Sequence, residues 1–255
     1  MTTVNDIFEN LNELAPVSMK MDFDNVGILV GNGTNEVKKC LIALDITSDV
    51  IEEAINIGAD LIVSHHPLIF DAQKTVLEND LLGGKLYRLI KNSVSAICMH
   101  TNLDIAEGGV NDALMSSLNC SASDTLDDDR CGRIGEYENP IAFGEFLLLC
   151  KTALNTKGLR YVSAGKQVKK LAVMGGSGGG ALYEAVKKGC DTYVTADIKY
   201  NQFLDAKELG INLIDADHFC TENVVVPVLY ERLKNAFPDV DFFISEKHQQ
   251  TVCFM

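Results

Sequence analysis

The segment 37–64, VKKCLIALDITSDVIEEAINIGADLIVS, decides the fold. Its apolar run 39–44 (KCLIAL) predicts a buried strand, the periodic stretch 49–57 predicts a helix, and the run 61–64 (LIVS) predicts a second buried strand. A helix between two buried strands is the repeating unit of parallel α/β sheets. We therefore expect an α/β fold with mainly parallel sheets.

The flanking sequence continues the same alternation. A helix is expected over about 3–15, where Thr3 and Asp6 resemble a capping box and apolar residues recur at helical spacing. Further along the chain, the pattern predicts a helix over 81–91 and a third buried strand over 96–99.

The second half of the chain repeats the first. Residues 168–195, VKKLAVMGGSGGGALYEAVKKGCDTYVT, align with 37–64 without a gap. Such a register indicates duplication of a strand–helix–strand unit. We expect two pseudo-equivalent α/β halves, 1–120 and 133–255, joined by the polar and acidic connector 121–132.

Composition excludes several classes of protein. The 255 residues include 22 Lys and Arg against 36 Asp and Glu, a formal net charge of −14. This acidic balance argues against nucleic acid as a partner, because phosphate binding needs clustered Lys and Arg. No apolar run approaches the roughly 20 residues of a membrane-spanning helix, and the acidic N-terminal stretch does not resemble a signal peptide. The eight Cys include no C-x-x-C pair, which favours buried thiols in a reducing compartment. We expect a cytoplasmic protein.

Four of the five histidines directly follow apolar strands. The candidate donors at three strand ends are His65 and His66, His100 and Asp104, and His218 and Glu222. Functional groups of α/β sheets gather at the carboxyl ends of strands, where the loops leave the sheet. Imidazole and carboxylate are the ligands of Zn, Fe, Mn or Co. The sequence therefore predicts a metal site.

The adjacent pair His65 and His66 favours two metal ions, because neighbouring histidines do not readily chelate one ion. Asp104 or Glu222 could then bridge the two ions. His218 and Glu222 are expected on an irregular turn before a helix near Pro227.

Two other features have simpler interpretations. His248, in the polar segment SEKHQQ, is expected to be a solvated surface residue. The run Gly175–Gly180 follows a predicted strand, and we interpret it as a tight turn that requires positive φ. Anion binding by its backbone is the alternative.

Four motifs place this sequence close to a known family. SHHPLIF (64–70), MHTNLDIAEGGVND (99–112), TADIKY (195–200) and DADHFCTE (215–222) resemble the NIF-three-like proteins, whose bacterial members are called GTP cyclohydrolase 1 type 2 homologues. The resemblance covers nearly the whole chain.

This resemblance implies a dinuclear metal site between the two α/β halves and a ring-shaped homohexamer. The family's metal ligands correspond to residues in all three motifs that contain histidine, namely His65, His66, Asp104, His218 and Glu222. His100 would lie beside them, as a proton shuttle or an orienting group. The chain departs from the family pattern at Asp217 and Ala196, where glycine is usual.

Two functions follow as hypotheses. The first is a metal-dependent hydrolase of a nucleotide or another phosphorylated compound, similar to a GTP cyclohydrolase, with two divalent metal ions per chain. The alternative is a non-catalytic, ring-shaped metal-binding assembly or regulatory protein. A catalytic site should keep one coordination position open, whereas a structural site should be closed.

Overall fold

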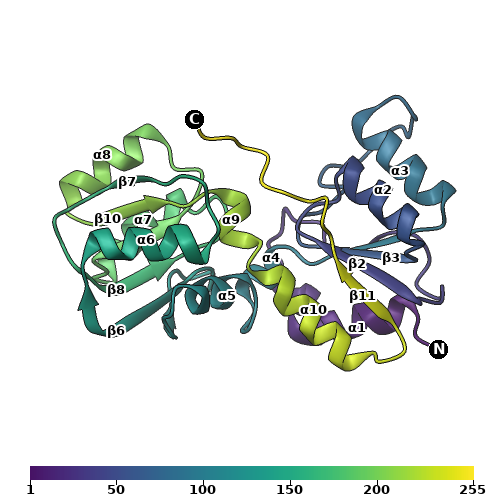
Figure 1. The fold of residues 1–255 in the computed structure, drawn as a ribbon, viewed down its shortest axis with the longest axis horizontal. Coiled ribbons are helices and arrows are strands. Elements are labelled where there is room, and N and C mark those ends of the chain that lie inside the picture. The colour runs from purple at the N-terminus through teal and green to yellow at the C-terminus, as the bar shows by residue number, and fades with distance from the viewer. The chain divides into compact units, whose positions relative to one another are not determined.

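A computed structural model describes residues 1–255, which form two compact units (Figure 1). The first unit contains Met1–Glu107 and Val226–Gln249, and the second contains Gly108–Val225 and Gln250–Met255. Both units are thus discontinuous in sequence. The expected connector 121–132 lies within the second unit, where part of it forms a strand.

The sheet of the first unit has five strands in the order β1-β4-β3-β2-β11. Their bounds are β1 (Gly27–Val30), β2 (Lys39–Ala43), β3 (Leu61–Ser64), β4 (Ser95–Cys98) and β11 (Asp241–Ile244). All neighbours are parallel except β1 and β4. Because β11 pairs with β2, the C-terminal part of the chain returns to the first unit.

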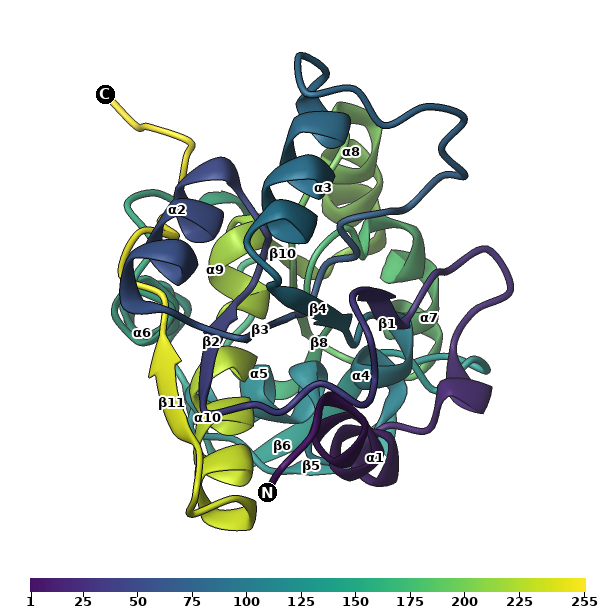
Figure 2. The same cartoon turned by 90° about the vertical axis from the view of Figure 1, so that its right-hand side faces the viewer.

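Helices cover both faces of this sheet. Figures 1 and 2 show α2 and α3 on one face and α1 and α10 on the other. The helices are α1 (Val4–Leu14), α2 (Ser48–Ile57), α3 (Leu81–Lys91), α4 (Thr101–Ile105) and α10 (Val225–Ala236), with a short 3-10 turn η1 (Val17–Met19). Buried side chains such as Ile51 of α2, Leu89 of α3 and Leu41 of β2 form one apolar core.

The sheet of the second unit has six strands in the order β5-β6-β8-β9-β10-β7. Their bounds are β5 (Ala122–Thr125), β6 (Arg133–Ile141), β7 (Arg160–Val162), β8 (Val168–Val173), β9 (Thr192–Thr195) and β10 (Asn212–Asp215). Only β8, β9 and β10 are mutually parallel. The prediction of mainly parallel sheets is not met here, because β5 with β6, β6 with β8 and β7 with β10 pair in the antiparallel direction.

The helices of the second unit are α5 (Val110–Ser117), α6 (Phe143–Ala153), α7 (Leu182–Lys187), α8 (Tyr200–Leu209) and α9 (His218–Glu222), with the 3-10 turn η2 (Gly179–Ala181). Leu114 of α5 and Phe146 of α6 pack with Leu171, Val194 and Ile214 from the parallel strands. This cluster is the core on one face of the sheet.

The two sheets share a four-strand topology that agrees with the duplication expected from the sequence. β1 to β4 form the spatial order β1-β4-β3-β2, and β7 to β10 form the order β7-β10-β9-β8, with the same strand directions. Equivalent hydrogen bonds recur in the two copies. The Asp60 carboxylate accepts from the Lys39 N–H at 3.0 Å, and the Asp191 carboxylate accepts from the Lys170 N–H at 2.7 Å.

Local signals placed the first elements to within one residue. α1 begins directly after its N-cap residue Thr3. In the capping box, the Asp6 carboxylate accepts from the Thr3 N–H at 2.7 Å. α2 ends at Gly58, whose φ of 68° is the left-handed conformation that glycine adopts readily.

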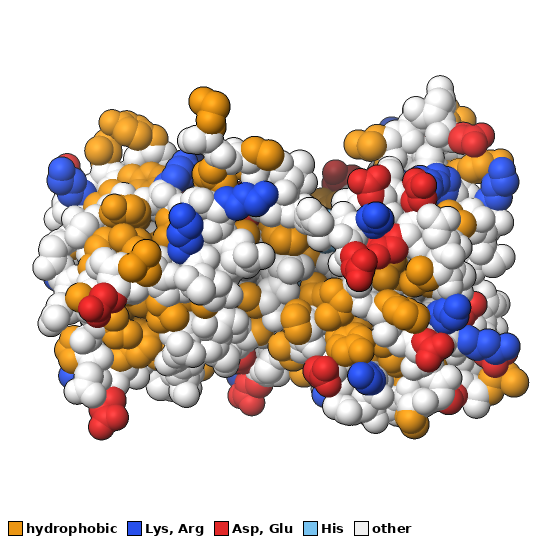
Figure 3. Space-filling model, in the orientation of Figure 1, with side chains coloured by type: hydrophobic (Ala, Val, Ile, Leu, Met, Phe, Trp, Pro, Cys, Tyr) orange, Lys and Arg blue, Asp and Glu red, His pale blue; other side chains and the backbone are white.

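The surface carries both signs of charge. On the face drawn in Figure 3, Lys and Arg side chains are interspersed with acidic and apolar ones. None of the helices has the length and apolar character needed to cross a membrane.

Candidate metal centre

In the first unit, the ends of β3 and β4 bring three histidines together. The ligand nitrogens of His65, His66 and His100 all lie within 4.8 Å of one another. The ring centroids of His65 and His100 are 5.2 Å apart, and those of His66 and His100 are 5.5 Å apart. Three imidazoles at this spacing match the donor set of a transition-metal ion.

His65 is fully buried, and its orientation is fixed by the backbone. Its Nδ1 lies 2.9 Å from the Met99 carbonyl oxygen, which can only accept a hydrogen bond. The proton therefore sits on Nδ1, and the lone pair is on Nε2. That Nε2 lies 3.6 Å from Oδ1 of Asp104, which comes from α4. The pair presents one nitrogen and one carboxylate oxygen to a single position.

His66 and His100 are each oriented by a carboxylate. Nδ1 of His66 lies 2.8 Å from Oδ1 of Asp45, and Nδ1 of His100 lies 2.8 Å from Oδ1 of Asp24. A carboxylate on one ring nitrogen leaves Nε2 as the ligating atom and makes it more basic. All three imidazoles of this cluster thus present Nε2.

Asp24 is held as an anion inside the protein. Burial raises the pKa of Asp24, but hydrogen bonds from His100 and from the hydroxyl and N–H of Thr101 outweigh it. The net pKa lies well below its ordinary value. A buried carboxylate that stays ionised at neutral pH can hold the His100 ring in one tautomer.

In the second unit, α9 supplies the remaining predicted donors. Nε2 of His218 lies 3.0 Å from Oε2 of Glu222, one helical turn later, and its Nδ1 lies 2.7 Å from Oδ2 of Asp197. The expected irregular turn is therefore a short helix, separate from α10. Helical geometry puts residues i and i+4 on one face, so both side chains point the same way.

Asp217 explains how α9 begins. Its φ is 75°, a conformation usual for glycine, and its carboxylate accepts from the Cys220 N–H at 3.2 Å. The side-chain amide of Gln250 also donates to Asp217. The left-handed backbone at Asp217 is strained, and the helix cap that its side chain provides beside His218 offsets this strain. Ala196, the other departure from the family pattern, is fully buried.

The glycine run is a close-packed turn. A Cβ on Gly176 would lie 2.1 Å from Oε1 of Glu222 and 3.2 Å from Nε2 of His218. The N–H groups of Gly175 and Gly176 donate within the protein, to Asn111 and Thr221 at 2.9 and 3.0 Å. These engaged amides favour the tight-turn interpretation over an anion cradle. Glycine lets the backbone approach the donors of α9.

Sequence reasoning missed four residues: three aspartates that orient the predicted histidines, and His248, which contacts one of those aspartates. Asp45 and Asp197 each lie two residues after a strand, β2 and β9, so the rule that found the histidines could have found them. Asp24 lies three residues before β1, without a local signal for its partner. His248 was expected on the surface, yet its side chain is 9% exposed, and its Nε2 lies 3.2 Å from Asp45 Oδ2.

The cysteines contribute no donor to these clusters. No disulfide joins the eight residues, as the composition predicted, and only Cys253 is exposed. Burial raises the pKa of the Cys150 and Cys220 thiols to about 12. Both are therefore protonated at neutral pH.

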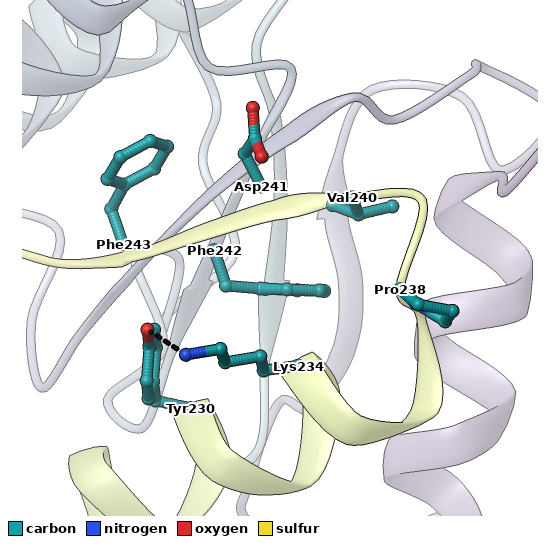
Figure 4. A pocket seen from close by; sticks show the side chains of 7 residues that line it. All are labelled: Tyr230, Lys234, Pro238, Val240, Asp241, Phe242 and Phe243. Carbon is teal, nitrogen blue, oxygen red and sulfur yellow. Dashed lines mark hydrogen bonds between the residues drawn. The ribbon is translucent and has the colours of Figure 1, made fainter.

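A separate pocket of about 450 Å³ lies between α10 and β11 (Figure 4). In Figure 4, Tyr230 and Lys234 line it from the helix, with Lys234 Nζ 3.2 Å from the Tyr230 hydroxyl, and Phe242 lines it from the strand. None of the predicted metal ligands lines this pocket, so it is not part of the candidate metal site.

The comparison with known proteins settles the family. A family model described as Duf34/NIF3 (NGG1p interacting factor 3) matches residues 2–251. The chain belongs to this family. The resemblance inferred from the histidine motifs is thus confirmed.

Members of the family match over the full length. A Clostridium perfringens protein named GTP cyclohydrolase 1 type 2 homolog is 37% identical over 252 residues, which cover 96% of each chain. A Staphylococcus aureus protein of known structure has a TM-score of 0.92 at 29% identity, covering 100% of this chain and 99% of that one. Reduced HcgD from Methanocaldococcus jannaschii has a TM-score of 0.84 at 30% identity, covering 96% and 98%.

Proposed function

We propose that the protein is a metal-dependent hydrolase of a nucleotide or another phosphorylated compound, with two divalent metal ions per chain. The proposed ligands are the five donors His65, His66, Asp104, His218 and Glu222, with Zn, Fe, Mn or Co as the ion. One observation carries the proposal. Every histidine among them has its Nδ1 against a carboxylate or a carbonyl oxygen, which is the outer-partner arrangement of metal-binding histidines.

The chain's own residues can supply proton transfer beside such a centre. A bound divalent ion contributes Lewis acidity toward water and a substrate oxygen. His100, oriented by Asp24 through Nδ1, presents Nε2 as a proton acceptor and then donor. Because the family resemblance places His100 beside the ligands rather than among them, we assign it the role of proton shuttle.

Two exposed aromatic rings support a substrate with a flat ring. Phe23 and Phe70 are 63% and 47% exposed, and their centroids are 6.2 Å apart. Phe70 also contacts the His100 ring, with centroids 6.4 Å apart. The amide of Asn25 joins the two loops by donating to the Ile69 carbonyl at 2.6 Å. Aromatic side chains of this kind stack on nucleobases, and the family's bacterial members are named for a guanine nucleotide.

The test measures metal content and turnover together. Purified protein is analysed for bound metal and then screened, metal-loaded, against nucleotides and phosphoesters. We expect Glu222→Gln to lower both metal content and turnover, and His100→Ala to slow turnover at nearly unchanged metal content. If His100→Ala loses metal as severely as Glu222→Gln, His100 is a ligand and the division of roles is wrong.

A second function rests on the surface of the second unit. Leu148 and Tyr200 are 66% and 78% exposed, and Figure 3 shows several apolar side chains on this unit. Such exposure favours self-association, and we propose a homohexamer whose metals serve assembly or partner binding. Light scattering at micromolar protein tests the oligomer, and a monomer would reject it. A loaded protein inactive on all substrates tested would favour this second function.

A further inference from the structure

The C-terminal segment that follows β11 is fixed to the first unit. The Ser245 N–H donates to the Ile42 carbonyl at 2.9 Å, which continues the pairing of β11 with β2. The Glu53 carboxylate of α2 then accepts from the Ser245 hydroxyl and from the Glu246 N–H. The Ser245 hydroxyl oxygen accepts from the His248 N–H at 3.1 Å. These bonds determine where the His248 ring lies.

His248 makes a two-point contact with Asp45. The Asp45 N–H lies 3.4 Å from Nδ1 of His248, and Nε2 of His248 lies 3.2 Å from Oδ2 of Asp45. A backbone N–H can only donate, so Nδ1 accepts and the proton of a neutral His248 is on Nε2. The same ring therefore donates to the carboxylate. One neutral imidazole satisfies both contacts.

The other carboxylate oxygen of Asp45 orients His66. Oδ1 of Asp45 lies 2.8 Å from Nδ1 of His66, while Oδ2 faces His248. The Asp45 side chain is 41% exposed, so water competes for its oxygens. A second partner on Oδ2 restricts rotation of the carboxylate and keeps Oδ1 on His66. The chain of contacts runs from residue 248 to residue 66 through one aspartate.

We propose that His248 is a positioning residue of the metal centre, which fixes Asp45 and thereby holds Nε2 of His66 in place as a ligand. This inference rests on the proposed function, because it assumes that His66 binds metal. Loss of the residue that directly orients a ligating histidine, here Asp45, typically lowers metal affinity by about 10- to 100-fold, and this range is the upper limit for His248. The contact of His248 with Asp45 gives the segment after β11 a role that neither the sequence pattern nor the family resemblance indicated.

The first experiment measures Co²⁺ affinity by competition with a chelator. We expect His248→Ala to bind Co²⁺ at the site that holds His66 about 10-fold more weakly than the wild type, the low end of the range for an outer partner. His248→Gln should recover most of this loss, because its amide can still donate to Asp45. The matched control is Gln249→Ala, an exposed neighbour; Gln250 is unsuitable because it contacts Asp217. Equal affinity in His248→Ala and Gln249→Ala would overturn the proposal.

A double-mutant cycle tests the route through Asp45. Asp45→Asn should weaken Co²⁺ binding, and adding His248→Ala to it should cause little further loss. Independent, additive losses would mean that His248 acts elsewhere and would overturn the proposal.

A third measurement separates positioning from stability. We expect metal-free His248→Ala to unfold at nearly the same temperature as Gln249→Ala, while the visible absorption of its bound Co²⁺ changes with the ligand geometry. A large drop in unfolding temperature with an unchanged Co²⁺ spectrum would assign His248 a merely structural role. A wild type that binds no Co²⁺ would refute the proposed function itself. A wild type and a His248→Ala variant that bind Co²⁺ with equal affinity would refute only the role of His248.

Discussion

Gly176→Ala should remove Glu222 from its ligating position. The added Cβ would lie 2.1 Å from Oε1 of Glu222, whereas non-bonded carbon and oxygen atoms approach to roughly 3.2 Å. The carboxylate must therefore move by about 1 Å. Glu222 is only 4% exposed, so it cannot simply turn into solvent. Metal–ligand distances tolerate about 0.2 Å, and a shift of this size breaks the bond.

The magnitude has two parts. Alanine at the φ of 62° found at Gly176 costs roughly 1–2 kcal/mol in left-handed strain. For a chain of this size, that corresponds to a fall of about 2–8 °C in unfolding temperature. Displacing a direct ligand should cost at least the loss known for outer partners, about 10- to 100-fold in metal affinity or roughly 1.4–2.7 kcal/mol.

Gly189→Ala is the matched control. Gly189 has a φ of 75° and nothing within 4 Å of its Cβ position, so the variant suffers the strain without the clash. The assay compares the thermal unfolding of both metal-free variants with their metal affinity. We expect similar losses of stability but weakened metal binding only in Gly176→Ala. If both variants bind metal equally well, the glycine run does not shape the metal site.

Three further outcomes follow from the same contacts. Bound metal should be released between about pH 7 and 5, as measured by dialysis and elemental analysis, because imidazole ligands must be neutral to bind. Asp6→Asn should lower the unfolding temperature at pH 7 and have progressively less effect as the pH falls below about 3.9. Hydrogen bonds from Thr3 lower the folded-state pKa of Asp6, so its contribution is present above the unfolded pKa and is lost as the pH falls through the folded-state pKa. Phe70→Leu should raise KM for a nucleotide substrate at unchanged metal content, whereas Tyr87→Leu on α3 should leave KM unchanged.

The parts of the fold that depend on local pattern could be predicted from the sequence. Buried runs such as 61–64 become strands because a continuous apolar run of that length fits a sheet covered on both faces. The duplication was visible because strand, helix and turn residues recur in the same register. The donors were visible because four of the five histidines gather at the ends of three apolar strands.

The partners of distant segments could not be predicted in the same way. Nothing in the residues 241–244 (DFFI) specifies pairing with β2, about 200 residues earlier, because backbone hydrogen bonds carry no sequence identity. The same holds for His248, whose contact with Asp45 spans 203 positions. The division into units and the contact of His248 with Asp45 both depend on that one pairing.

The duplicated topology also explains how the two donor sets differ. His66 and Asp197 each lie two residues after equivalent strands, β3 and β9, and His100 and Asp217 each lie two residues after β4 and β10. In the first unit both positions present an imidazole, and aspartates elsewhere orient those rings. In the second unit both positions are aspartates, of which Asp197 orients the histidine and Asp217 caps its helix. Equivalent loop positions thus hold a ligand, His66, in one copy and a supporting carboxylate, Asp197, in the other. Exchanging the residue types of His66 and Asp197 should therefore weaken metal binding in both units, since each position has partners suited to one role only.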